Sequence, residues 1–364
     1  MFENIYRGKR ILVTGHTGFK GSWLCAWLLS LDAEVAGYSL DVPTQPANFE
    51  ALELARRMGH IQGDVRDKNS LQKVLDKFQP EIVFHLAAQS LVRKSYEDPA
   101  LTIETNALGT LNLLDCLRAQ TSVKAAVLVT SDKCYENVKW LWGYRENDRL
   151  GGKDPYSTSK ACAELIASTY MESFFKEKGP NIATTRAGNV IGGGDWAGDR
   201  VVPDCIRAWS EGKPVVIRNP LATRPWQHVL EPLSGYLILG QKLYQGVDEA
   251  KNQAFNFGPP AKVNQSVVDL IAEMAQNWPG AEYEIQQDTD HLKRESMLLK
   301  LNSDKALQIL QWTAVLDFKE TVSMVGRWYK TFYDKGPSSA NEITGRQIRE
   351  YTEKAAQTNL SWAR

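Results

Sequence analysis

The stretch that decides the fold is Leu12-Val13-Thr14-Gly15-His16-Thr17-Gly18-Phe19-Lys20-Gly21. Its order predicts a strand, a glycine turn and a helix, with the glycines spaced as GxxGxxG. Glycines allow a tight turn and let backbone N–H groups approach a pyrophosphate at the N-terminus of a helix. A glycine triplet also occurs in purely structural turns. The position of this triplet, after the first strand and before the first helix, indicates a dinucleotide site.

Short apolar runs alternate with amphipathic segments up to about residue 190, a pattern typical of a parallel sheet flanked by helices. The fold class predicted is therefore α/β, a doubly wound parallel sheet of the Rossmann type. Ligands of such a sheet lie at the carboxyl ends of its strands. The predicted strands are 10–14, 34–38, 60–62, 82–86, 125–130 and 182–186, and the predicted helices are 21–31, 70–77, 99–118 and 156–178.

Prolines and glycines break this alternation after Gly188, which predicts a smaller C-terminal substrate-binding domain. A helix at 229–244 and a strand at 254–257 are expected to return to the first domain, and further helices are predicted at 266–278 and 317–333. The segment from Gly336 is polar and is expected to be a mobile tail. The predicted domains are 1–188 with 229–259 for the dinucleotide, and 189–228 with 260–364 for the substrate.

The composition excludes several classes of protein. Lys+Arg and Asp+Glu balance at 43 each, so the chain lacks the basic excess of a nucleic-acid-binding protein. No apolar run reaches the roughly 18 residues of a membrane span, and a strand pattern starts by Arg10 where a signal peptide would lie. Five scattered cysteines without a CxxC pair argue against a disulfide framework and a zinc site. We expect a cytoplasmic protein that binds no metal, nucleic acid or membrane.

Tyr156 and Lys160 stand four residues apart on a predicted helix, so their side chains share one face. At roughly 4 Å and an effective dielectric of about 20, the ammonium would lower the pKa of the phenol by up to ~3 units. Tyr156 is therefore a candidate base toward a substrate hydroxyl. The same spacing also arises by chance with a lysine that reaches solvent. The glycine turn upstream favours the catalytic interpretation.

Two aspartates follow the second and third predicted strands. Asp41 stands where a carboxylate can accept hydrogen bonds from both ribose hydroxyls of NAD and repel the 2′-phosphate of NADP. An aspartate that only belongs to the loop is the alternative interpretation. Asp64 is a second candidate, for contact with the adenine edge. Together they favour NAD over NADP.

The glycine turn with Tyr156 and Lys160 resembles the short-chain dehydrogenase/reductase superfamily. The chain length and the added domain resemble its extended branch, which modifies nucleotide sugars, over most of residues 9–330. Asn106 and the stretch from His85 to Ala88 belong to this resemblance. It implies NAD as the cofactor, held by Gly15, Thr17, Gly18, Phe19, Gly21, Asp41, Asp64, Val65, Leu86, Ala87, Ala88, Tyr156 and Lys160, with Thr130 or Ser131 beside the nicotinamide ribose.

The loop after the fifth predicted strand, Thr130-Ser131-Asp132-Lys133-Cys134-Tyr135, separates the chemistries of this branch. Epimerases of the branch carry small residues where Asp132 stands, whereas a dehydratase needs an acid there for the departing C6 hydroxyl. Most 4,6-dehydratases have Asp-Glu at this point, the glutamate being the C5 base, and this chain has Asp-Lys. That departure and the Gly188–Trp196 run resemble the CDP-glucose 4,6-dehydratase family.

The implied activity is that of a lyase converting CDP-glucose to CDP-4-keto-6-deoxyglucose and water. It proceeds by transient C4 oxidation with bound NAD, C5–C6 elimination and hydride return to C6. Lys133 is then a neutral base, whose pKa near ~10.4 must fall by about three units, or a charge that stabilises the enolate, or a surface lysine. Asp132 is the acid or a turn aspartate. The implied catalytic residues are Ser131, Asp132, Lys133, Tyr156 and Lys160.

The resemblance also places Asn189, Arg224 and Arg294 on the nucleotide and its diphosphate, where guanidinium groups suit phosphate oxygens. Without this resemblance, both arginines would be interpreted as surface residues. Related enzymes pair through two long helices, so 99–118 and 156–178 are the candidates for a homodimer or homotetramer. The alternative functions are another NAD-dependent nucleotide-sugar dehydratase, a 4-epimerase, or a non-catalytic NAD-binding protein.

Overall fold

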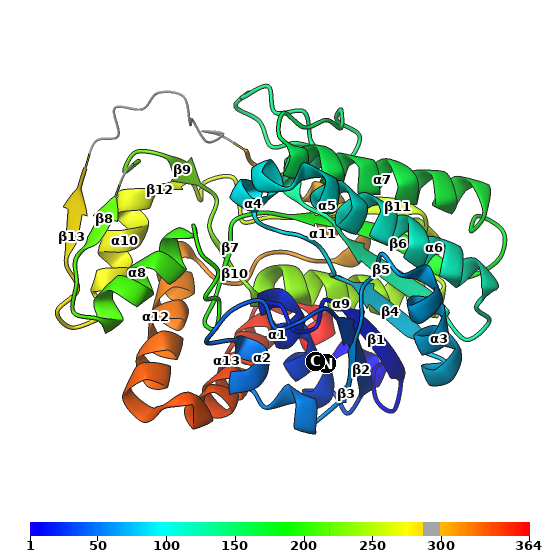
Figure 1. Ribbon diagram of the computed structural model, residues 1–364, viewed down its shortest axis with the longest axis horizontal. Coiled ribbons are helices and arrows are strands. Elements are labelled where there is room, and N and C mark those ends of the chain that lie inside the picture. Colours follow the sequence, from blue (N-terminus) through cyan, green and yellow to red (C-terminus); the bar gives the residue numbers. More distant parts are fainter. Residues whose placement is uncertain (218, 287–298) are drawn as a thin grey trace.

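The computed structural model describes residues 1–217, 219–286 and 299–364. Its centre is a seven-stranded sheet in the order β11-β6-β5-β4-β1-β2-β3, and all six pairings are parallel (Figure 1). The predicted fold class is confirmed, and the strand predicted at 254–257 joins the same sheet. The strands are β1 Arg10–Thr14, β2 Glu34–Ser39, β3 Gly59–Gln62, β4 Ile82–His85, β5 Ala125–Val129, β6 Asn181–Ala187 and β11 Gln253–Phe257.

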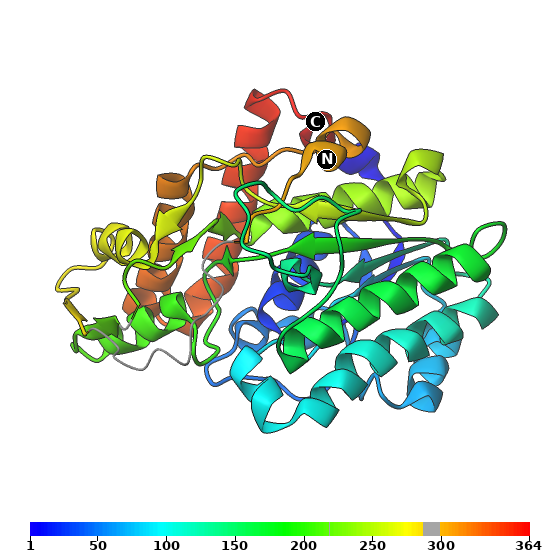
Figure 2. The ribbon, with the colours of Figure 1, turned by 90° about the horizontal axis from the view of Figure 1, so that it is seen from above.

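Helices cover both faces of the sheet because its strands are apolar on both sides. Ile11 and Val13 of β1 belong to one buried cluster with α1 and α9, whereas Leu12 between them belongs to a second cluster with α3, α6 and α7. Figure 2 shows α7 on one side of the sheet and α9 on the other. These helices are α1 Phe19–Ser30, α3 Lys68–Phe78, α6 Gly109–Ala119, α7 Pro155–Ser173 and α9 Leu230–Gln245.

The order of the strands reverses between β1 and β4. The chain runs outward from β1 through β2 to β3, then returns to β4 and continues through β5 to β6 on the other side. In open α/β sheets, ligands bind beyond the carboxyl ends of the strands at such a reversal. The loops after β1 and β4 are therefore the expected place for a cofactor.

Two of the predicted helices differ from the structure in their extent. The predicted helix 99–118 consists of α5 Pro99–Ile103, a π-helical turn Glu104–Leu108 and α6. Such turns are frequent at functional sites. The predicted helix 156–178 ends at Ser173, because Phe175 turns back into the buried cluster beneath α7.

Three pairs of short strands follow the main sheet. β7 Val190–Ile191 pairs with β10 Gln227–His228, β9 Thr223–Arg224 with β12 Gln265–Ser266, and β8 Val215–Ile217 with β13 Tyr283–Ile285. Neighbouring helices are α8 Val201–Ser210, α10 Val267–Ala275 and α12 Phe318–Lys335. Trp23 of α1 and Trp328 of α12 belong to one continuous buried cluster. The division into two domains stays a prediction.

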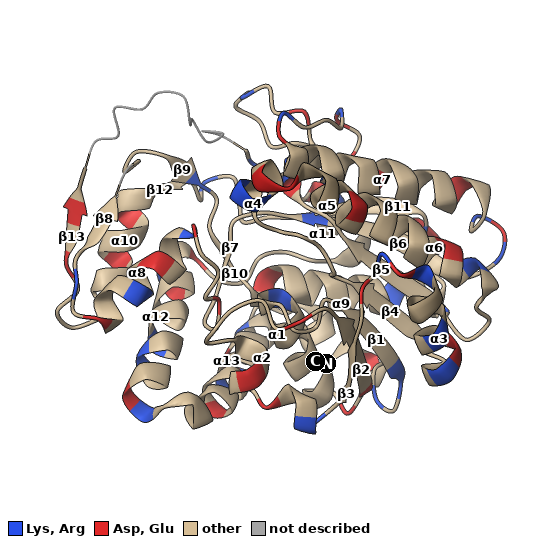
Figure 3. Cartoon of the chain, viewed as in Figure 1, with Lys and Arg blue, Asp and Glu red and all other residues tan. Residues whose placement is uncertain are grey.

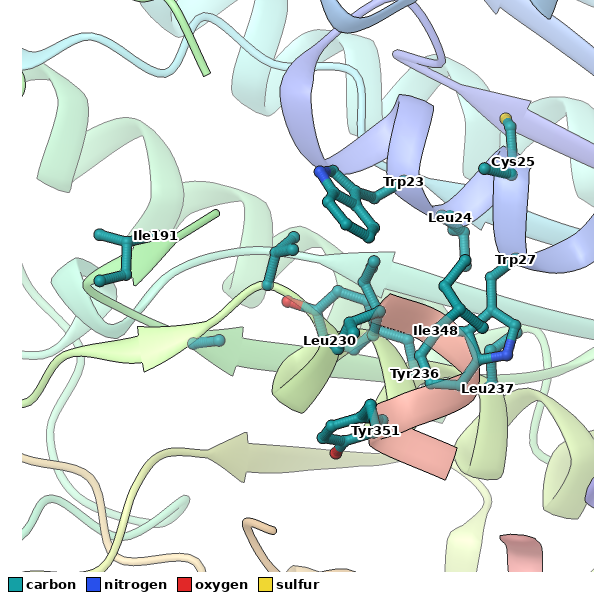
Figure 4. Packing of buried hydrophobic residues seen from close by; sticks show 14 of the residues in the cluster. Trp23, Leu24, Cys25, Trp27, Ile191, Leu230, Tyr236, Leu237, Ile348 and Tyr351 are labelled. Atoms are coloured by element: carbon teal, nitrogen blue, oxygen red, sulfur yellow. The ribbon is translucent and has the colours of Figure 1, made fainter. Parts of the chain in front are cut away.

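The segment after Gly336 is not the polar mobile tail expected from its composition, and this expectation is wrong. It forms α13 Ala340–Gln357, whose Ile343, Ile348 and Tyr351 are buried. Figure 4 shows Ile348 and Tyr351 beside Trp27 of α1 and Leu237 of α9. The apolar residues recur at helical spacing among polar ones, so the average composition conceals a buried face.

The remaining elements are short. Charges of both signs are mixed along the helices, in keeping with the balanced composition (Figure 3). Within the described ranges, no helix combines the length and the apolar character that crossing a bilayer requires. The short elements not yet named are α2 Asn48–Ala51, α4 Val92–Glu97, α11 Asp304–Leu310 and the single turns Phe2–Asn4, Leu54–Arg56, Asp132–Cys134, Asp248–Ala250, Pro337–Ser339 and Ser361–Ala363.

Candidate active site

The glycine turn lies at the reversal of the sheet and leaves no room for side chains. Gly15 follows β1 with φ of +74°, and a Cβ there would lie 2.6 Å from the backbone nitrogen of Ala87 after β4. A Cβ on Gly21 would lie 2.2 Å from the carbonyl oxygen of Gly15. The turn is therefore a bare backbone surface, which fits the close approach of a pyrophosphate.

The N-terminus of α1 completes this surface. Gly18 is the N-cap, and no side chain caps the helix there. The first N–H groups of a helix have no intrahelical partner, and the helix dipole makes this end positive. Residues 19–21 therefore present donors to an anion at the position predicted for the dinucleotide phosphates.

Asp41 follows β2 and Asp64 follows β3, and their side chains have different partners. Thr17 shares a hydrogen bond of 2.8 Å with Ser39 and donates to the carbonyl oxygen of Asp41. The Asp41 side chain is exposed beside the glycine turn, where it accepts a hydrogen bond from Gln62. The Asp64 carboxylate instead binds Arg66, at 2.6 Å between Oδ2 and Nη2. The geometry thus suits Asp41 for a ribose, whereas Asp64 anchors Arg66.

The segment from Leu86 to Ala88 continues from β4 along the glycine turn. The Ala87 N–H donates to Thr14 Oγ1 at 3.2 Å. Asn106, in the π-helical turn, accepts from the Gln89 N–H and donates to Ser159 Oγ, each at 2.8 Å. It therefore joins the loop after β4 to α7. Val65, also predicted at the cofactor site, is buried beneath Gly109.

Tyr156 and Lys160 lie in the first turns of α7, whose N-cap Asp154 accepts a hydrogen bond from the Ser157 N–H at 2.9 Å. Both side chains are buried, and Lys160 Nζ donates to the Val129 carbonyl oxygen at 3.4 Å. Burial lowers the pKa of Lys160 to about 8, against the opposing charge of Glu164.

Burial also raises the pKa of Tyr156 to about 12, although a hydrogen bond with Ser131 opposes the rise. In the polypeptide by itself, the pKa of Tyr156 is therefore shifted upward, opposite to the lowering expected from its spacing with Lys160. The cost of burying a phenolate exceeds the help of the Ser131 hydrogen bond and of the Arg200 charge. A further positive charge bound in the site would lower this pKa again.

Asp132 lies in the same site, on the turn that follows β5. Ser131 is the N-cap of this turn, because its Oγ accepts from the Lys133 N–H at 3.2 Å. Ser131 Oγ also donates to Asp132 Oδ1 at 2.9 Å. Asp132 is buried, and its charge is among those that raise the pKa of Tyr156. The carboxyl group and the phenol therefore face one site, and Asp132 is not the capping residue of the turn.

Gly188 at the end of β6 holds Asp132 from the other side. A Cβ at Gly188 would lie 1.9 Å from Asp132 Oδ2.

Lys133 is half-buried, and its amine forms no hydrogen bond within the described parts of the chain.

The predicted substrate residues are less completely placed. Asn189 follows Gly188 with φ of +52°, and its carbonyl oxygen accepts from the Gln227 N–H at 3.2 Å. Arg224 of β9 is half-buried and donates to the Thr223 carbonyl oxygen at 2.8 Å. Arg294 lies outside the described residues.

Sequence reasoning missed two cations of the site. Arg200 forms an ion pair with Asp195, at 2.7 Å between Nη1 and Oδ2, and its charge acts on Tyr156. The sequence carries no signal for Arg200, because a loop brings it back to the site. Lys20 lies in the quoted glycine motif, but the motif predicts no role for its side chain. The charged groups around Lys20 come from distant parts of the chain, so the motif itself does not reveal them.

Comparisons with known proteins show the family of this chain. The sequence model of the family described as GDP-mannose 4,6 dehydratase matches residues 12–325. The chain belongs to the GDP-mannose 4,6-dehydratase family. The CDP-glucose 4,6-dehydratase of Salmonella typhimurium is 47% identical to it over 336 residues, which cover 91% of this chain and 93% of that protein.

Solved structures related to this family share the fold. The NAD complex of the Thermus thermophilus UDP-glucose 4-epimerase is 25% identical, with a TM-score of 0.75 over 88% of this chain and 99% of that one. The dTDP-glucose 4,6-dehydratase of Streptomyces venezuelae, solved with NAD, is 22% identical, with a TM-score of 0.75 over 90% and 98%. This chain thus shares its fold with both a dehydratase and an epimerase, and the fold alone does not separate the two reactions.

Proposed function

We propose that this chain is an NAD-dependent nucleotide-sugar 4,6-dehydratase, a lyase that converts CDP-glucose to CDP-4-keto-6-deoxyglucose and water. The observation that carries the proposal is the meeting of Asp132 with Tyr156 in one buried site. A phenol suffices to exchange a proton at C4, but loss of water from C6 also needs an acid. The likeness to the Salmonella CDP-glucose 4,6-dehydratase supports CDP-glucose as the substrate.

The residues present fit NAD as the cofactor. The bare glycine turn and the uncapped start of α1 suit its pyrophosphate, and the exposed Asp41 carboxylate suits an unphosphorylated ribose. When bound, NAD supplies reversible oxidation: it accepts the C4 hydride and later returns it to C6. Asp41 would repel the additional phosphate of NADP.

The side chains of the site then have separate tasks. Tyr156 takes the C4 hydroxyl proton. Burial raises its pKa, and the positive charge of a bound nicotinamide would offset that rise. Ser131 holds the Tyr156 oxygen and Asp132 in place. Asp132 gives its proton to the departing C6 oxygen. The ketone formed at C4 makes the C5 proton acidic, so that a base can remove it.

Lys133 replaces the glutamate that most 4,6-dehydratases carry beside this aspartate. As a cation it would stabilise the negative charge of the C4 enolate. As a neutral amine it would remove the C5 proton. Asn189, Arg224 and Arg294 are proposed to hold the nucleotide and its diphosphate, and which residue selects cytosine is not assigned.

Assembly and location are also part of the proposal. A homodimer or homotetramer would pair through α5–α6 and α7, where Leu108 and Leu165 are exposed apolar side chains. The cytoplasmic location stays a prediction.

A panel of nucleotide-glucose substrates tests the function. The purified protein is incubated with CDP-, dTDP-, UDP- and GDP-glucose and NAD, and a 4-keto-6-deoxy sugar is detected by its ultraviolet absorbance in alkali. We expect turnover of CDP-glucose above the others, with no net reduction of NAD. Formation of a galactose epimer would instead establish the 4-epimerase. Binding of NAD with no turnover of any sugar would establish a non-catalytic protein.

A further inference from the structure

Gln227 is a buried glutamine of β10 that has no role in the mechanism above. It is 2% exposed, and its Nε2 donates to the carbonyl oxygens of Gly188 and Phe257, at 2.9 and 3.0 Å. Both partners are acceptors, so the nitrogen of the amide must face them. They lie at neighbouring strand ends, because Ala187 of β6 pairs with Phe257 of β11. One side chain thus joins the carboxyl ends of two strands, at the edge of the sheet where the candidate site lies.

The backbone of Gln227 is fixed against the same turn. β10 pairs with β7, which places Gln227 opposite Val190 (Figure 1). The Gln227 N–H donates to the Asn189 carbonyl oxygen at 3.2 Å, and Asn189 has a left-handed φ of +52°. Gln227 therefore holds the carbonyl groups of two consecutive residues after β6, one through its side chain and the other through its main chain.

Asp132 packs directly on this turn. A Cβ at Gly188 would lie 1.9 Å from Asp132 Oδ2 and 2.2 Å from its Cγ, so the carboxyl group lies against the bare Gly188 backbone. Its other oxygen, Oδ1, accepts from Ser131 Oγ at 2.9 Å. The carboxyl group is therefore held between a hydroxyl and the Gly188 main chain, and a shift of Gly188 would free one side of it.

Stability alone gives little reason for an amide at this position. Gln227 Oε1 is buried and has no hydrogen-bond partner among the residues that the structure describes. Burying an unpaired acceptor costs free energy, which offsets part of what the two bonds from Nε2 contribute. The geometry gives the amide a second task, which is to fix the backbone on which the Asp132 carboxyl group packs.

We propose that Gln227 is a positioning residue, which holds the Gly188 backbone so that the Asp132 carboxyl group meets the departing C6 oxygen. The inference rests on the proposed function, in which Asp132 acts only in the loss of water and Tyr156 acts in the C4 oxidation. Loss of the Gln227 amide should therefore slow the elimination and leave the preceding oxidation intact. A residue that only stabilised the fold would lower the active fraction of the protein, and so reduce both steps alike.

A partial reaction separates these two steps. Gln227→Met keeps the length of the side chain but removes both N–H donors. We expect turnover of CDP-glucose to fall about 10²-fold, the loss typical of a displacement of about 1 Å. Reduced nicotinamide should accumulate in a single turnover, where its near-ultraviolet absorbance is followed. The Kd values for NAD and CDP-glucose, measured by calorimetry, are expected to stay within about threefold of the parent.

Gln347→Met is the matched control. Gln347 is a buried glutamine of α13 whose Nε2 donates to the Met324 carbonyl oxygen of α12 at 2.6 Å. Its Oε1 likewise has no partner within residues 1–217, 219–286 and 299–364. We expect Gln347→Met to lower the urea midpoint of unfolding as Gln227→Met does, but without accumulation of reduced nicotinamide.

A double-mutant cycle tests whether Gln227 acts through Asp132. If it does, Gln227→Met lowers turnover in the parent background but has little further effect in Asp132→Asn. Equal fold losses in the two backgrounds would overturn the assignment, as would parent-like turnover of Gln227→Met or a loss of turnover without accumulated reduced nicotinamide. If Gln227→Met does not fold, Gln227→Asn replaces it, because its amide is too short to reach both carbonyl groups. A parent protein that does not turn over CDP-glucose at all would instead overturn the proposed function, and the assignment with it.

Discussion

The Glu164 carboxylate and the Arg186 guanidinium form a buried ion pair, with 2.7 Å between Oε2 and Nη2. Glu164 stands one turn after Lys160 on α7 and also accepts from the hydroxyls of Thr130 and Thr184. Burial raises its pKa, but Arg186 and these hydrogen bonds more than offset the rise and hold the pKa below its ordinary value. The pair therefore joins the helix that carries Tyr156 to the end of β6, and the Thr130 hydroxyl joins the same carboxylate to the end of β5, next to Asp132.

The first prediction concerns this ion pair. Glu164→Ala leaves Arg186 buried without its anion, so we expect a loss of about 3–5 kcal/mol in the free energy of unfolding. Glu172→Ala removes an exposed pair between the last turn of α7 and Lys176, which follows the helix, and is expected to cost less than about 0.5 kcal/mol. Urea unfolding followed by circular dichroism measures both. Equal losses of unfolding free energy in the two variants would show that the buried pair stabilises the fold no more than the exposed pair does.

A second prediction follows from the contact of Gly188 with Asp132. Gly188→Ala places a methyl group 1.9 Å from the present position of Asp132 Oδ2, so the carboxyl group must move. Because a displacement of about 1 Å can cost some 10²-fold in rate, we expect turnover to fall by that order. Binding of NAD, measured by calorimetry, is expected to stay within about threefold of the parent. Full activity in Gly188→Ala would remove Asp132 from the mechanism.

The glycine turn yields a third prediction. In Gly21→Ala, the Cβ would lie 2.2 Å from the Gly15 carbonyl oxygen, which forces the turn apart. We expect NAD affinity to fall at least 10²-fold and stability to fall by about 1–3 kcal/mol. Gly198→Ala is the control, because a Cβ there meets no atom within 4 Å. Calorimetric titration with NAD compares them, and an unchanged Kd in Gly21→Ala would place the cofactor elsewhere.

Buried histidines predict how stability depends on pH. Burial lowers the pKa of His16 to about 4 and the pKa values of His85 and His228 to about 3. Below the unfolded pKa of ~6.5, the unfolded chain binds protons that the folded chain does not. Stability is therefore lost as pH falls from about 6.5 toward 4, by roughly 1.4 kcal/mol per pH unit for each histidine.

His228→Asn tests this dependence. Asparagine keeps an acceptor for the Leu230 N–H, which His228 Nδ1 accepts at 3.3 Å, but it does not titrate. The free energy of unfolding is measured by urea titration at several pH values between 6.5 and 5. Its slope against pH should be smaller in the variant than in the parent, by about a third of the part that the three histidines produce. A parallel pH dependence in parent and variant would show that His228 is not neutral in the fold.

The fifth prediction concerns the C-terminal segment. Trp362 is buried and stacks on Phe2 at 5.1 Å between ring centroids. Trp362→Ala is expected to cost about 3–5 kcal/mol, whereas Trp142→Ala, at a site 71% exposed, should cost less than about 0.5 kcal/mol. A chain that ends at Gly336 should fail to fold cooperatively. Thermal unfolding of the three proteins measures these effects, and a stable truncated chain would restore the interpretation as a tail.

Local sequence predicted much of the fold correctly. The seven strands of the main sheet lie within one residue of their predicted bounds, because most of them are buried apolar runs, with the exposed β3 as the exception. The helix of 99–118 was predicted without its π-helical turn, which depends on contacts of Asn106 with the loop after β4 and with α7. The C-terminal helix was missed because its apolar residues form one narrow face in a polar segment.

The sequence by itself determined the order of the elements, the glycine turn and the set of side chains able to do the chemistry, since these depend on spacing along the chain. Only the tertiary structure decided which charges meet. It brought Arg200 and Lys20 to Asp132 and Tyr156, and it reversed the expected shift in the pKa of Tyr156. The reason is physical: desolvation and long-range Coulomb interactions depend on neighbours far apart in sequence, and folding alone creates them.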